Sequence, residues 1–245
     1  LEYSKVFRSK YAAILNTSPD HLERHKTLKN YISAKFKLIK NQNKYSTAFV
    51  NKFDKNVQSK IKKIKYKSKI IKVDTKIKKN FINKFDNEYF SSASNIENLS
   101  FVIELAKKFN IRKDNLIRVV KKFKGLNYRQ QIIFKTKNIS IINDSKSTSY
   151  SSSIEMLKRK DNIYWLMGGI PKIGDRFNLS QNDCQNIKGY IFGINQKKFS
   201  LDLKDKIKLK KFSNLSKALN ELFRDIKKDN SSKKTILFSP AAASF

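Results

Sequence analysis

The sequence predicts an α/β protein in which buried parallel strands alternate with helices. Short apolar runs rich in Ile, Tyr and Phe recur along the 245 residues, as in strands that are buried on both faces. Between these runs, apolar residues recur every three to four positions, which is the period of a helix with one buried face. Strands that alternate with helices favour a parallel sheet covered by helices.

Five apolar runs are the predicted strands: residues 11–16, 139–143, 163–167, 190–194 and 235–238. A tight polar motif follows four of them, and the three prolines of the chain, Pro19, Pro171 and Pro240, fall in these motifs, where no ladder donor is needed. Parallel sheets bind ligands beyond the carboxyl ends of their strands. A strand-terminating turn alone would explain one such motif. Four motifs that carry His, Lys or Ser instead predict a ligand-binding site at the carboxyl ends of the strands.

Helical periodicity covers five segments between the predicted strands: residues 27–40, 96–109, 113–123, 152–159 and 214–226. A boundary is expected near Lys124-Gly125, so that residues 1–124 form one domain and residues 125–245 a second. Residues 130–143 then read as a hairpin with a polar turn at 136–138. Four aromatic residues of the apolar runs are expected in the core: Phe134, Tyr164, Trp165 and Phe192.

The formal net charge of +34, from 54 Lys+Arg against 20 Asp+Glu, first suggests a nucleic-acid-binding protein. Arg, whose planar fork suits bases and phosphates, supplies only eight of these 54 cations. The lysines are spread along the chain, and even in the dense stretch 60–79 they alternate with Ile, Val and Tyr. A solvated Lys-rich surface is therefore favoured and no nucleic-acid partner is expected, although a general attraction for anions such as nucleotides remains.

Several classes of protein are excluded by simple counts. A single cysteine, Cys184, rules out an intramolecular disulfide framework and a Cys-rich zinc site. Every apolar run is far shorter than the about 18 residues of a membrane span, and no signal peptide is visible. We expect a cytoplasmic protein. Because the chain begins at Leu1 and stops abruptly at Phe245, we also expect it to be a fragment.

The common nucleotide-binding and nucleophile motifs are absent from the sequence. Gly169 and Gly174 have the spacing of a phosphate loop, but Asp175-Arg176 follows them in place of Lys-Ser, and no Gly-x-Gly-x-x-Gly occurs. The segment 144–146 lacks the Gly-x-Ser-x-Gly elbow of a serine nucleophile. Lys146, at a predicted strand-to-helix turn, better suits anion capture, because a helix N-terminus offers open N–H groups.

The two histidines, His21 and His25, have a spacing that places both on one face of a helix. Leu22 occupies the position at which a zinc protease requires Glu, so this motif is excluded. His21 follows Asp20 at a predicted strand end. It is either part of a magnesium shell or a loop histidine whose ring bonds a backbone carbonyl.

The ordered set of motifs resembles that of the Mur ligases, and of their D-glutamate-adding members in particular. The matching stretches are residues 14–25, 31–35, 95–98, 123–129, 142–148, 168–172 and 238–244. Single motifs are moderately specific, whereas their order is strongly so. The resemblance implies the later part of a central P-loop-type ATPase domain, followed by most of a Rossmann-like C-terminal domain that binds the amino acid.

The activity that the resemblance implies is ATP-dependent amide-bond formation. ATP would convert the carboxylate of UDP-N-acetylmuramoyl-L-alanine to an acyl phosphate, which the amine of D-glutamate attacks, in peptidoglycan precursor synthesis. Phosphorylation supplies the leaving group that a carboxylate lacks. The enzyme is expected to be a monomer. Two alternatives stay open: a sister Mur ligase or folylpolyglutamate synthase that adds another amino acid, and, more remotely, a basic RNA-binding protein.

The resemblance also implies residue roles. His21 and Lys35 would be the catalytic residues and would hold Mg²⁺, with Lys35 carbamylated so that its amine becomes an anionic oxygen ligand. Asn95 and Asn98 would contact the adenine of ATP. Contacts with the rest of the nucleotide would come from Arg129 and Asp144. The D-glutamate would be held by Lys146, Thr148, Lys172 and Ser244.

Some positions depart from the family pattern. Ser92 and Ser94 stand where the family has Gly and His, and Asn127-Tyr128 replaces the usual Pro-His before Arg129. Ala242 stands where many members carry Cys. The family's UDP-binding domain, phosphate loop and final segment have no counterpart in these 245 residues. We therefore expect no ligase activity from the chain by itself.

Overall fold

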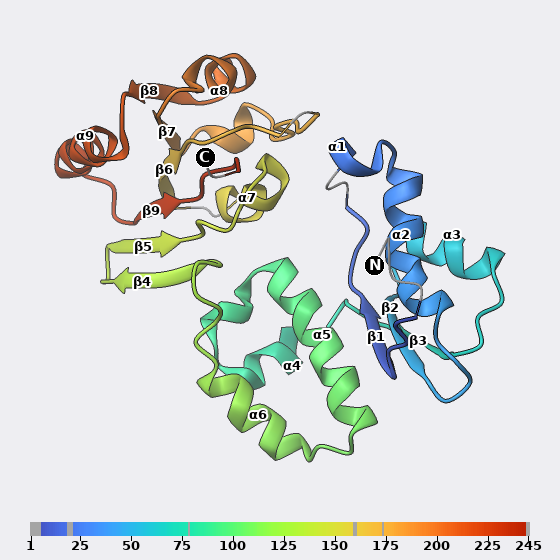
Figure 1. The fold of residues 1–245 in the computed structure, drawn as a ribbon. Coiled ribbons are helices and arrows are strands. Elements are labelled where there is room, and N and C mark those ends of the chain that lie inside the picture. The colour runs from blue at the N-terminus through green and yellow to red at the C-terminus, as the bar shows by residue number, and fades with distance from the viewer. Residues whose placement is uncertain (1–5, 19–21, 78, 159–160, 173, 244–245) are drawn as a thin grey trace. The chain divides into compact units, whose positions relative to one another are not determined.

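The computed structural model describes residues 6–18, 22–77, 79–158, 161–172 and 174–243. The chain divides into two compact units, a first unit of residues 1–123 and a second unit of residues 124–245 (Figure 1). Two of the predicted site residues, His21 and Ser244, lie outside the described residues. No helix within the described part of the chain is long and apolar enough to cross a membrane.

The first unit is built on a parallel sheet of β1 (Tyr11–Ile14), β2 (Thr47–Asn51) and β3 (Lys69–Val73), in that order. Two helices, α2 (Leu28–Lys40) and α3 (Lys55–Lys63), bring Ile32, Phe36 and Val57 into the core on one face. On the other face, Phe101 of α5 (Ala93–Lys108) packs with Phe49 and Val73. The central strand β2 is consequently buried along its whole length.

Shorter helices complete the first unit. They are α1 (Leu22–His25), α4 (Lys79–Ile82), η1 (Asn83–Phe85), η2 (Glu88–Ser91) and α6 (Lys113–Lys122). Phe85 of η1, Phe90 of η2, Val120 of α6 and Leu99 of α5 form a small core between these four elements. Polar caps fix where the main helices begin, because the side chain of each cap accepts a hydrogen bond from a backbone N–H of the first turn. Thr27 caps α2, Asp54 caps α3 and Ser92 caps α5.

The second unit is a six-stranded sheet in the order β4-β5-β9-β6-β7-β8. Its strands are β4 (Gln131–Lys135), β5 (Ile139–Asn143), β6 (Asn162–Met167), β7 (Ile187–Phe192), β8 (Lys208–Phe212) and β9 (Lys234–Phe238). Only the hairpin strand β4 runs antiparallel to its neighbour. The last strand in sequence, β9, lies in the middle of the sheet, between β5 and β6.

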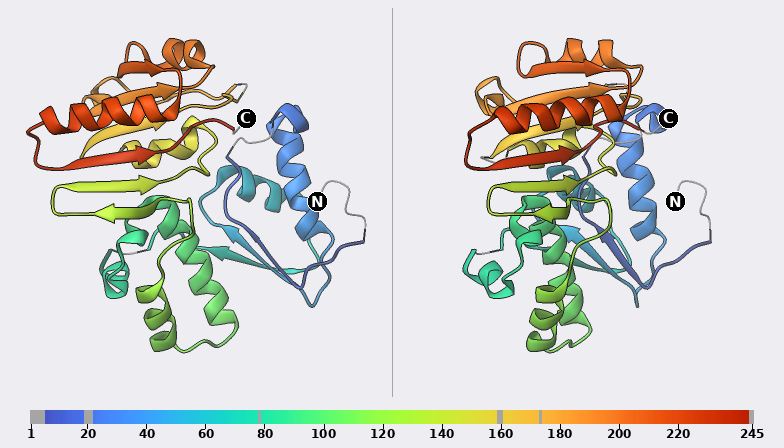
Figure 2. Two further views of the ribbon diagram at one scale, coloured as in Figure 1. Left: turned by 60° about the vertical axis from the view of Figure 1, so that its left-hand side comes forward. Right: turned by 90° about the vertical axis from the view of Figure 1, so that its left-hand side faces the viewer.

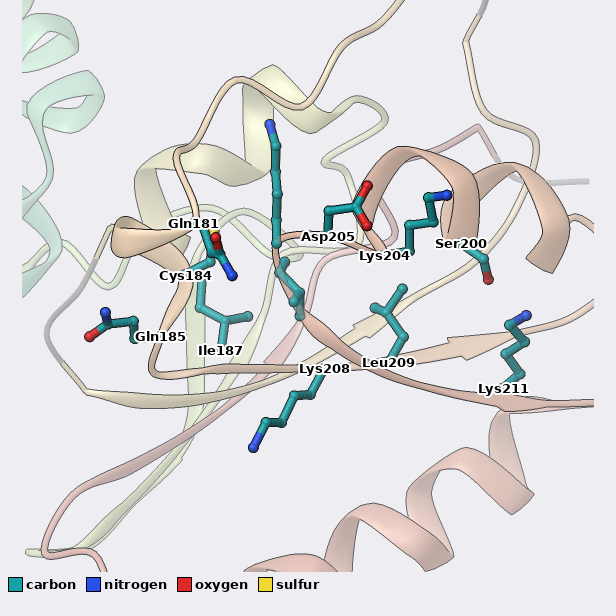
Figure 3. A pocket seen from close by; sticks show the side chains of 12 residues that line it. Gln181, Cys184, Gln185, Ile187, Ser200, Lys204, Asp205, Lys208, Leu209 and Lys211 are labelled. Carbon is teal, nitrogen blue, oxygen red and sulfur yellow. The ribbon is translucent and has the colours of Figure 1, made fainter.

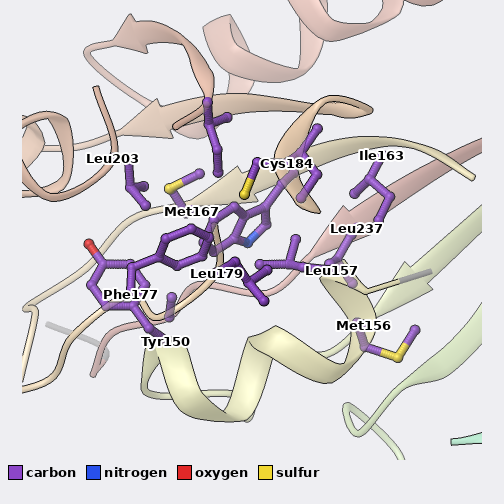
Figure 4. Close-up of a cluster of buried hydrophobic side chains, with 14 of the residues drawn as sticks. Tyr150, Met156, Leu157, Ile163, Met167, Phe177, Leu179, Cys184, Leu203 and Leu237 are labelled. Carbon is purple, nitrogen blue, oxygen red and sulfur yellow. The ribbon is translucent and has the colours of Figure 1, made fainter. Parts of the chain in front are cut away.

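Helices cover both faces of this sheet. On one face, Tyr150 of α7 (Tyr150–Leu157) and Phe199 of α8 (Gln196–Leu203) pack around the buried Trp165, in the core shown in Figure 4. On the other face lies α9 (Leu215–Lys228), whose Leu222 belongs to the same core as Tyr164 (Figure 2). A 3₁₀ turn, η3 (Asn182–Cys184), precedes β7. The predicted α/β fold with a Rossmann-like second part is confirmed.

The predicted strands and helices are all present, with shifted ends. The strand expected at 190–194 begins at Ile187 and ends at Phe192, and Ile194 is 83% exposed. The prediction that Phe134 lies in the core is wrong, because it is 51% exposed. β4 is an edge strand whose residues are largely exposed, so an apolar run did not identify a buried strand there. Tyr164 and Trp165 are buried as predicted, and Phe192 is partly buried.

Candidate functional site

Three neighbouring strands of the second unit, β5, β9 and β6, end at one edge of the sheet. Backbone hydrogen bonds join the turns that follow them. The N–H of Ala241 donates to the carbonyl of Ser147 at 3.0 Å, and Ile170 and Ala243 exchange two bonds of 2.9 and 3.0 Å. Lys146 and Thr148 follow β5, Lys172 follows β6, and residues 239–243 follow β9. The described residues that are predicted to bind the amino acid therefore lie on adjoining turns.

Two glycines make this close approach of turns feasible. A Cβ on Gly169 would lie 2.4 Å from the Ala243 carbonyl oxygen, and its φ of +133° disfavours any L side chain. A Cβ on Gly168 would lie 2.4 Å from the carbonyl oxygen of Phe192 on β7. The Gly-Gly pair of the 168–172 motif therefore packs the end of β6 against both neighbouring strand ends.

A buried network of hydroxyl groups ends at Asp144, the first residue after β5. Asp144 is 5% exposed, and its carboxylate accepts from the N–H of Gln130 at 3.1 Å and the hydroxyl of Ser239 at 3.2 Å. Ser239 also contacts the Ser153 hydroxyl at 2.7 Å, and that hydroxyl lies 2.9 Å from the Ser147 hydroxyl. Burial raises the pKa of Asp144 to about 6, against the hydrogen bonds and the nearby Arg129, which lower it.

The loop that carries Arg129 folds onto the same turn. The backbone N–H of Lys146 donates to the carbonyl of Tyr128 at 3.1 Å. Tyr128 and Gln130, on either side of Arg129, adopt the left-handed backbone conformation, with φ of 65° and 49°. The Arg129 side chain is exposed, whereas its neighbour Asp144 is buried. The two residues predicted to contact the nucleotide therefore lie close together but differ in exposure to solvent.

The first turn of α7 is occupied by a protein carboxylate. Ser149 caps the helix in a capping box with Ser152. The carboxylate of Asp175, three residues after Lys172, accepts from the N–H of Tyr150 at 2.6 Å. One N–H of this helix N-terminus, where the sequence suggested groups open to a ligand, is thus bonded to Asp175.

The equivalent edge of the first unit is simpler. Asp54, after β2, accepts from the N–H of Thr17 at 2.8 Å and from its hydroxyl at 2.8 and 2.9 Å, which joins the segments that follow β1 and β2. The Nζ of Lys35 donates to the carbonyl of Asn16 at 3.0 Å and lies 4.5 Å from the centre of the Tyr31 ring. Asn16 and Lys35 line a hollow of about 360 Å³ at the end of β1.

The two asparagines predicted to contact adenine lie on the first turns of α5. Asn95 is 5% exposed, and its side-chain amide donates to the carbonyl of Tyr89 at 2.7 Å. Asn98, one turn later, is exposed. The two residues therefore share a helix face but differ in burial, and the amide of Asn95 holds η2 against α5.

The described residues do not by themselves form a metal site. Among them, no group of three or more His, Cys, Asp or Glu side chains gathers. The carboxylate of Asp54, at the end of β2, already accepts from Thr17 and from the N–H of Val57. Of the two predicted metal ligands, only Lys35 is described, and its ammonium bonds a carbonyl.

A hollow of about 570 Å³ elsewhere in the second unit lacks the converging side chains of a ligand-binding site. It is lined by Lys204, Asp205, Lys208 and Lys211 around the buried Cys184, near the beginnings of β7 and β8. Figure 3 labels three of its four lysines, Lys204, Lys208 and Lys211, and their side chains point in different directions. Charges that do not converge cannot grip one ligand.

Three residues at these edges escaped the sequence analysis: Asp54, Asp175 and Ser239. Asp54 comes three residues after a short buried strand that was not predicted. Asp175 follows the 168–172 motif, and its polarity next to a strand-end turn was the available signal. The partners of Asp175 and Ser239 lie 25 to 95 residues away in sequence, which no local pattern reveals.

Comparison with known proteins finds similarity to the Mur ligases along the whole chain. Residues 2–117 match the family described as Mur ligase middle domain. The chain is 32% identical over its whole length to the UDP-N-acetylmuramoylalanine–D-glutamate ligase of Rickettsia prowazekii, and 30% identical to that of Rickettsia felis. It spans 59% and 58% of the length of these relatives.

Solved structures show the same fold at low sequence identity. MurF ligase from Thermotoga maritima, in complex with ADP, matches with a TM-score of 0.69 at 11% identity, over 95% of this chain and 58% of that one. This likeness supports the fold alone.

Proposed function

Since this chain belongs to the Mur ligase family, we propose that it is the ATPase and amino-acid-binding portion of a ligase that adds D-glutamate to UDP-N-acetylmuramoyl-L-alanine. The observation that carries this proposal is the match, along the whole of this chain, to parts of two enzymes named as D-glutamate ligases. The joined turns that bear Lys146, Thr148 and Lys172 support it, because they offer cations at one sheet edge to a substrate with two carboxylates.

In the proposed reaction, the carboxylate of the UDP-linked substrate takes the γ-phosphoryl group of ATP, which leaves ADP and an acyl phosphate. The amine of D-glutamate then attacks the acyl carbon, an amide bond forms, inorganic phosphate leaves and the amine loses a proton. Lys146 and Lys172 orient D-glutamate by its carboxylates, so that its amine is presented to the acyl carbon. Arg129, exposed beside Asp144, neutralises charge on the nucleotide.

We assign Mg²⁺, which would neutralise phosphate oxygens when bound, to His21 and Lys35. Lys35 lies at the Asn16 carbonyl, at the start of the segment that leads to His21. An ammonium group repels a cation, so this assignment requires carbamylation, in which the neutral amine adds to CO₂ and releases a proton. The described residues do not complete a metal shell, and no step here depends on one.

Asn95 and Asn98 are assigned to the adenine of ATP, with Asn98 as the exposed member of the pair. Thr148 and Ser244 complete the D-glutamate assignment. Because ATP and UDP-linked sugars are cytoplasmic metabolites, we place the reaction in the cytoplasm, and we propose a monomer.

The test is an activity assay of the whole protein that the gene encodes, which contains these 245 residues and is called the gene-encoded protein below. ADP release is measured with ATP, Mg²⁺ and UDP-N-acetylmuramoyl-L-alanine, in the presence of D-glutamate, L-alanine, meso-diaminopimelate or L-glutamate. We expect turnover that depends on D-glutamate. A preference for another amino acid would instead support a sister ligase, and the absence of any turnover, together with salt-dependent RNA binding, would contradict the enzyme assignment.

A further inference from the structure

The turn that carries Lys172 is fastened at both of its ends. At its beginning, Ile170 exchanges two backbone hydrogen bonds with Ala243. After its end, Phe177 is buried, stacks on Trp165 with ring centres 6.0 Å apart, and lies edge-on to Tyr150 at 5.6 Å (Figure 4). The carbonyl of Phe177 also accepts a hydrogen bond from Lys206 at 2.9 Å.

Between these anchors, the carboxylate of Asp175 reaches the first turn of α7. It accepts from the N–H of Tyr150 at 2.6 Å, and the backbone N–H of Asp175 donates to the carbonyl of Lys172 at 3.3 Å. Burial raises the pKa of Asp175, and its backbone hydrogen bonds and the positive charge of the nearby Lys172 oppose that rise. One side chain therefore joins the Lys172 turn to the helix that begins directly after Lys146 and Thr148.

The first turn of α7 is a favourable place for a carboxylate to accept hydrogen bonds. The first N–H groups of a helix have no partner within the helix and carry a partial positive charge. The ring of Tyr150 is fixed in the core, where its hydroxyl donates to Asp202 at 3.2 Å, so the N–H that Asp175 binds belongs to a rigid residue.

We propose that Asp175 is a positioning residue of the amino-acid site, which sets the spacing between Lys172 and the Lys146–Thr148 turn by binding the first turn of α7. This inference rests on the proposed function. A dicarboxylic substrate requires its cationic partners at a fixed separation, because both carboxylates must be bound at once for the amine to be aligned.

The test compares Asp175→Ala and Asp175→Asn with wild type in the gene-encoded protein. Asp183→Asn is the matched control, because Asp183 lies in the same connection and its carboxylate accepts from the N–H and the hydroxyl of the nearby Ser180. In Asp175→Ala we expect faster hydrogen exchange at the Tyr150 amide, and a KM for D-glutamate raised about tenfold while the KM for ATP stays within about twofold. Asp175→Asn keeps one acceptor oxygen and should show a smaller rise.

Unchanged amide exchange in Asp175→Ala would overturn the inference, and so would faster exchange with an unchanged KM for the amino acid, since the carboxylate would then be only structural. Trp165 fluorescence verifies that each variant is folded, because Phe177 stacks on that indole. If wild type uses another amino acid, the proposed function fails while the same KM comparison, made with that amino acid, still decides the role of Asp175.

Discussion

In the second unit, backbone hydrogen bonds and a buried hydroxyl network join the turns after β5, β9 and β6, whereas in the first unit the segments after β1 and β2 are joined by the carboxylate of Asp54. Both edges lie at the carboxyl ends of parallel strands. The turns of the proposed amino-acid site are therefore held in place by contacts within the protein. At the first edge, the proposed roles of Lys35 and His21 depend on a modification and a metal.

The largest effect is expected at the joined turns. Gly169→Ala would push a methyl group to 2.4 Å from the Ala243 carbonyl oxygen, so we expect a loss of about 2–4 kcal/mol in unfolding free energy. The matched control is Gly174→Ala, because Gly174 also has positive φ but has no atom within 4 Å of its added Cβ. It should cost only about 1–2 kcal/mol.

Urea unfolding followed by tryptophan fluorescence measures both variants in the 245-residue chain, since Trp165 is its one tryptophan and lies in the second unit. Equal costs for the two glycines would show that close packing of the turns is not what Gly169 provides, and would remove the distinction between the two edges.

A smaller and local effect is expected at the first edge. Asp54→Ala removes the cap of α3, with its 3.0 Å bond from Val57, together with the bonds from Thr17. We expect a loss of about 1–2 kcal/mol confined to the first unit. Hydrogen exchange should become faster at the Thr17 and Val57 amides.

The control is Asp74→Ala, because Asp74 forms an exposed pair with Lys52 that should contribute little. An equal change in the Trp165 unfolding transition in Asp54→Ala would contradict the confinement of the effect to the first unit.

A pH-dependent effect is expected from Asp144. Its folded-state pKa of about 6 lies above the ordinary 3.8, so its contribution to stability is complete below about pH 4 and is lost as the pH rises through 6. Asp144→Asn removes the titration. When the pH is raised from 5 to 8, the free energy of unfolding of the variant should therefore increase by about 1–2 kcal/mol relative to that of wild type, as measured by urea unfolding at each pH. A difference that is the same at both pH values would show that burial does not raise this pKa.

The sequence predicted the elements of the second unit better than those of the first. Runs such as 163–167 are apolar throughout, whereas β2 has only Ala48, Phe49 and Val50 between polar residues. Strands β3 and β8 were missed because Lys is interspersed with Ile, Val, Leu or Phe in them, as on a solvated surface. Lysines on β8, an edge strand, are compatible with a strand because they discourage pairing with other chains.

For the site, the rule that functional residues follow parallel strands placed Lys146, Thr148 and Lys172 on adjoining turns. It could not supply Asp175 or Ser239, whose roles depend on partners distant in sequence. Nor could it separate Asp144 from Arg129, because only the fold shows that the carboxylate is buried in a hydroxyl network while the guanidinium is exposed.

The most direct test of the amino-acid site is the KM for D-glutamate of the gene-encoded protein carrying Lys146→Met or Lys172→Met, measured beside the KM for ATP. If these lysines grip the substrate carboxylates, each change should raise the KM for D-glutamate about ten- to a hundredfold and leave the KM for ATP within about twofold. Unchanged KM values for D-glutamate in both variants, with the proteins folded and active, would contradict the account.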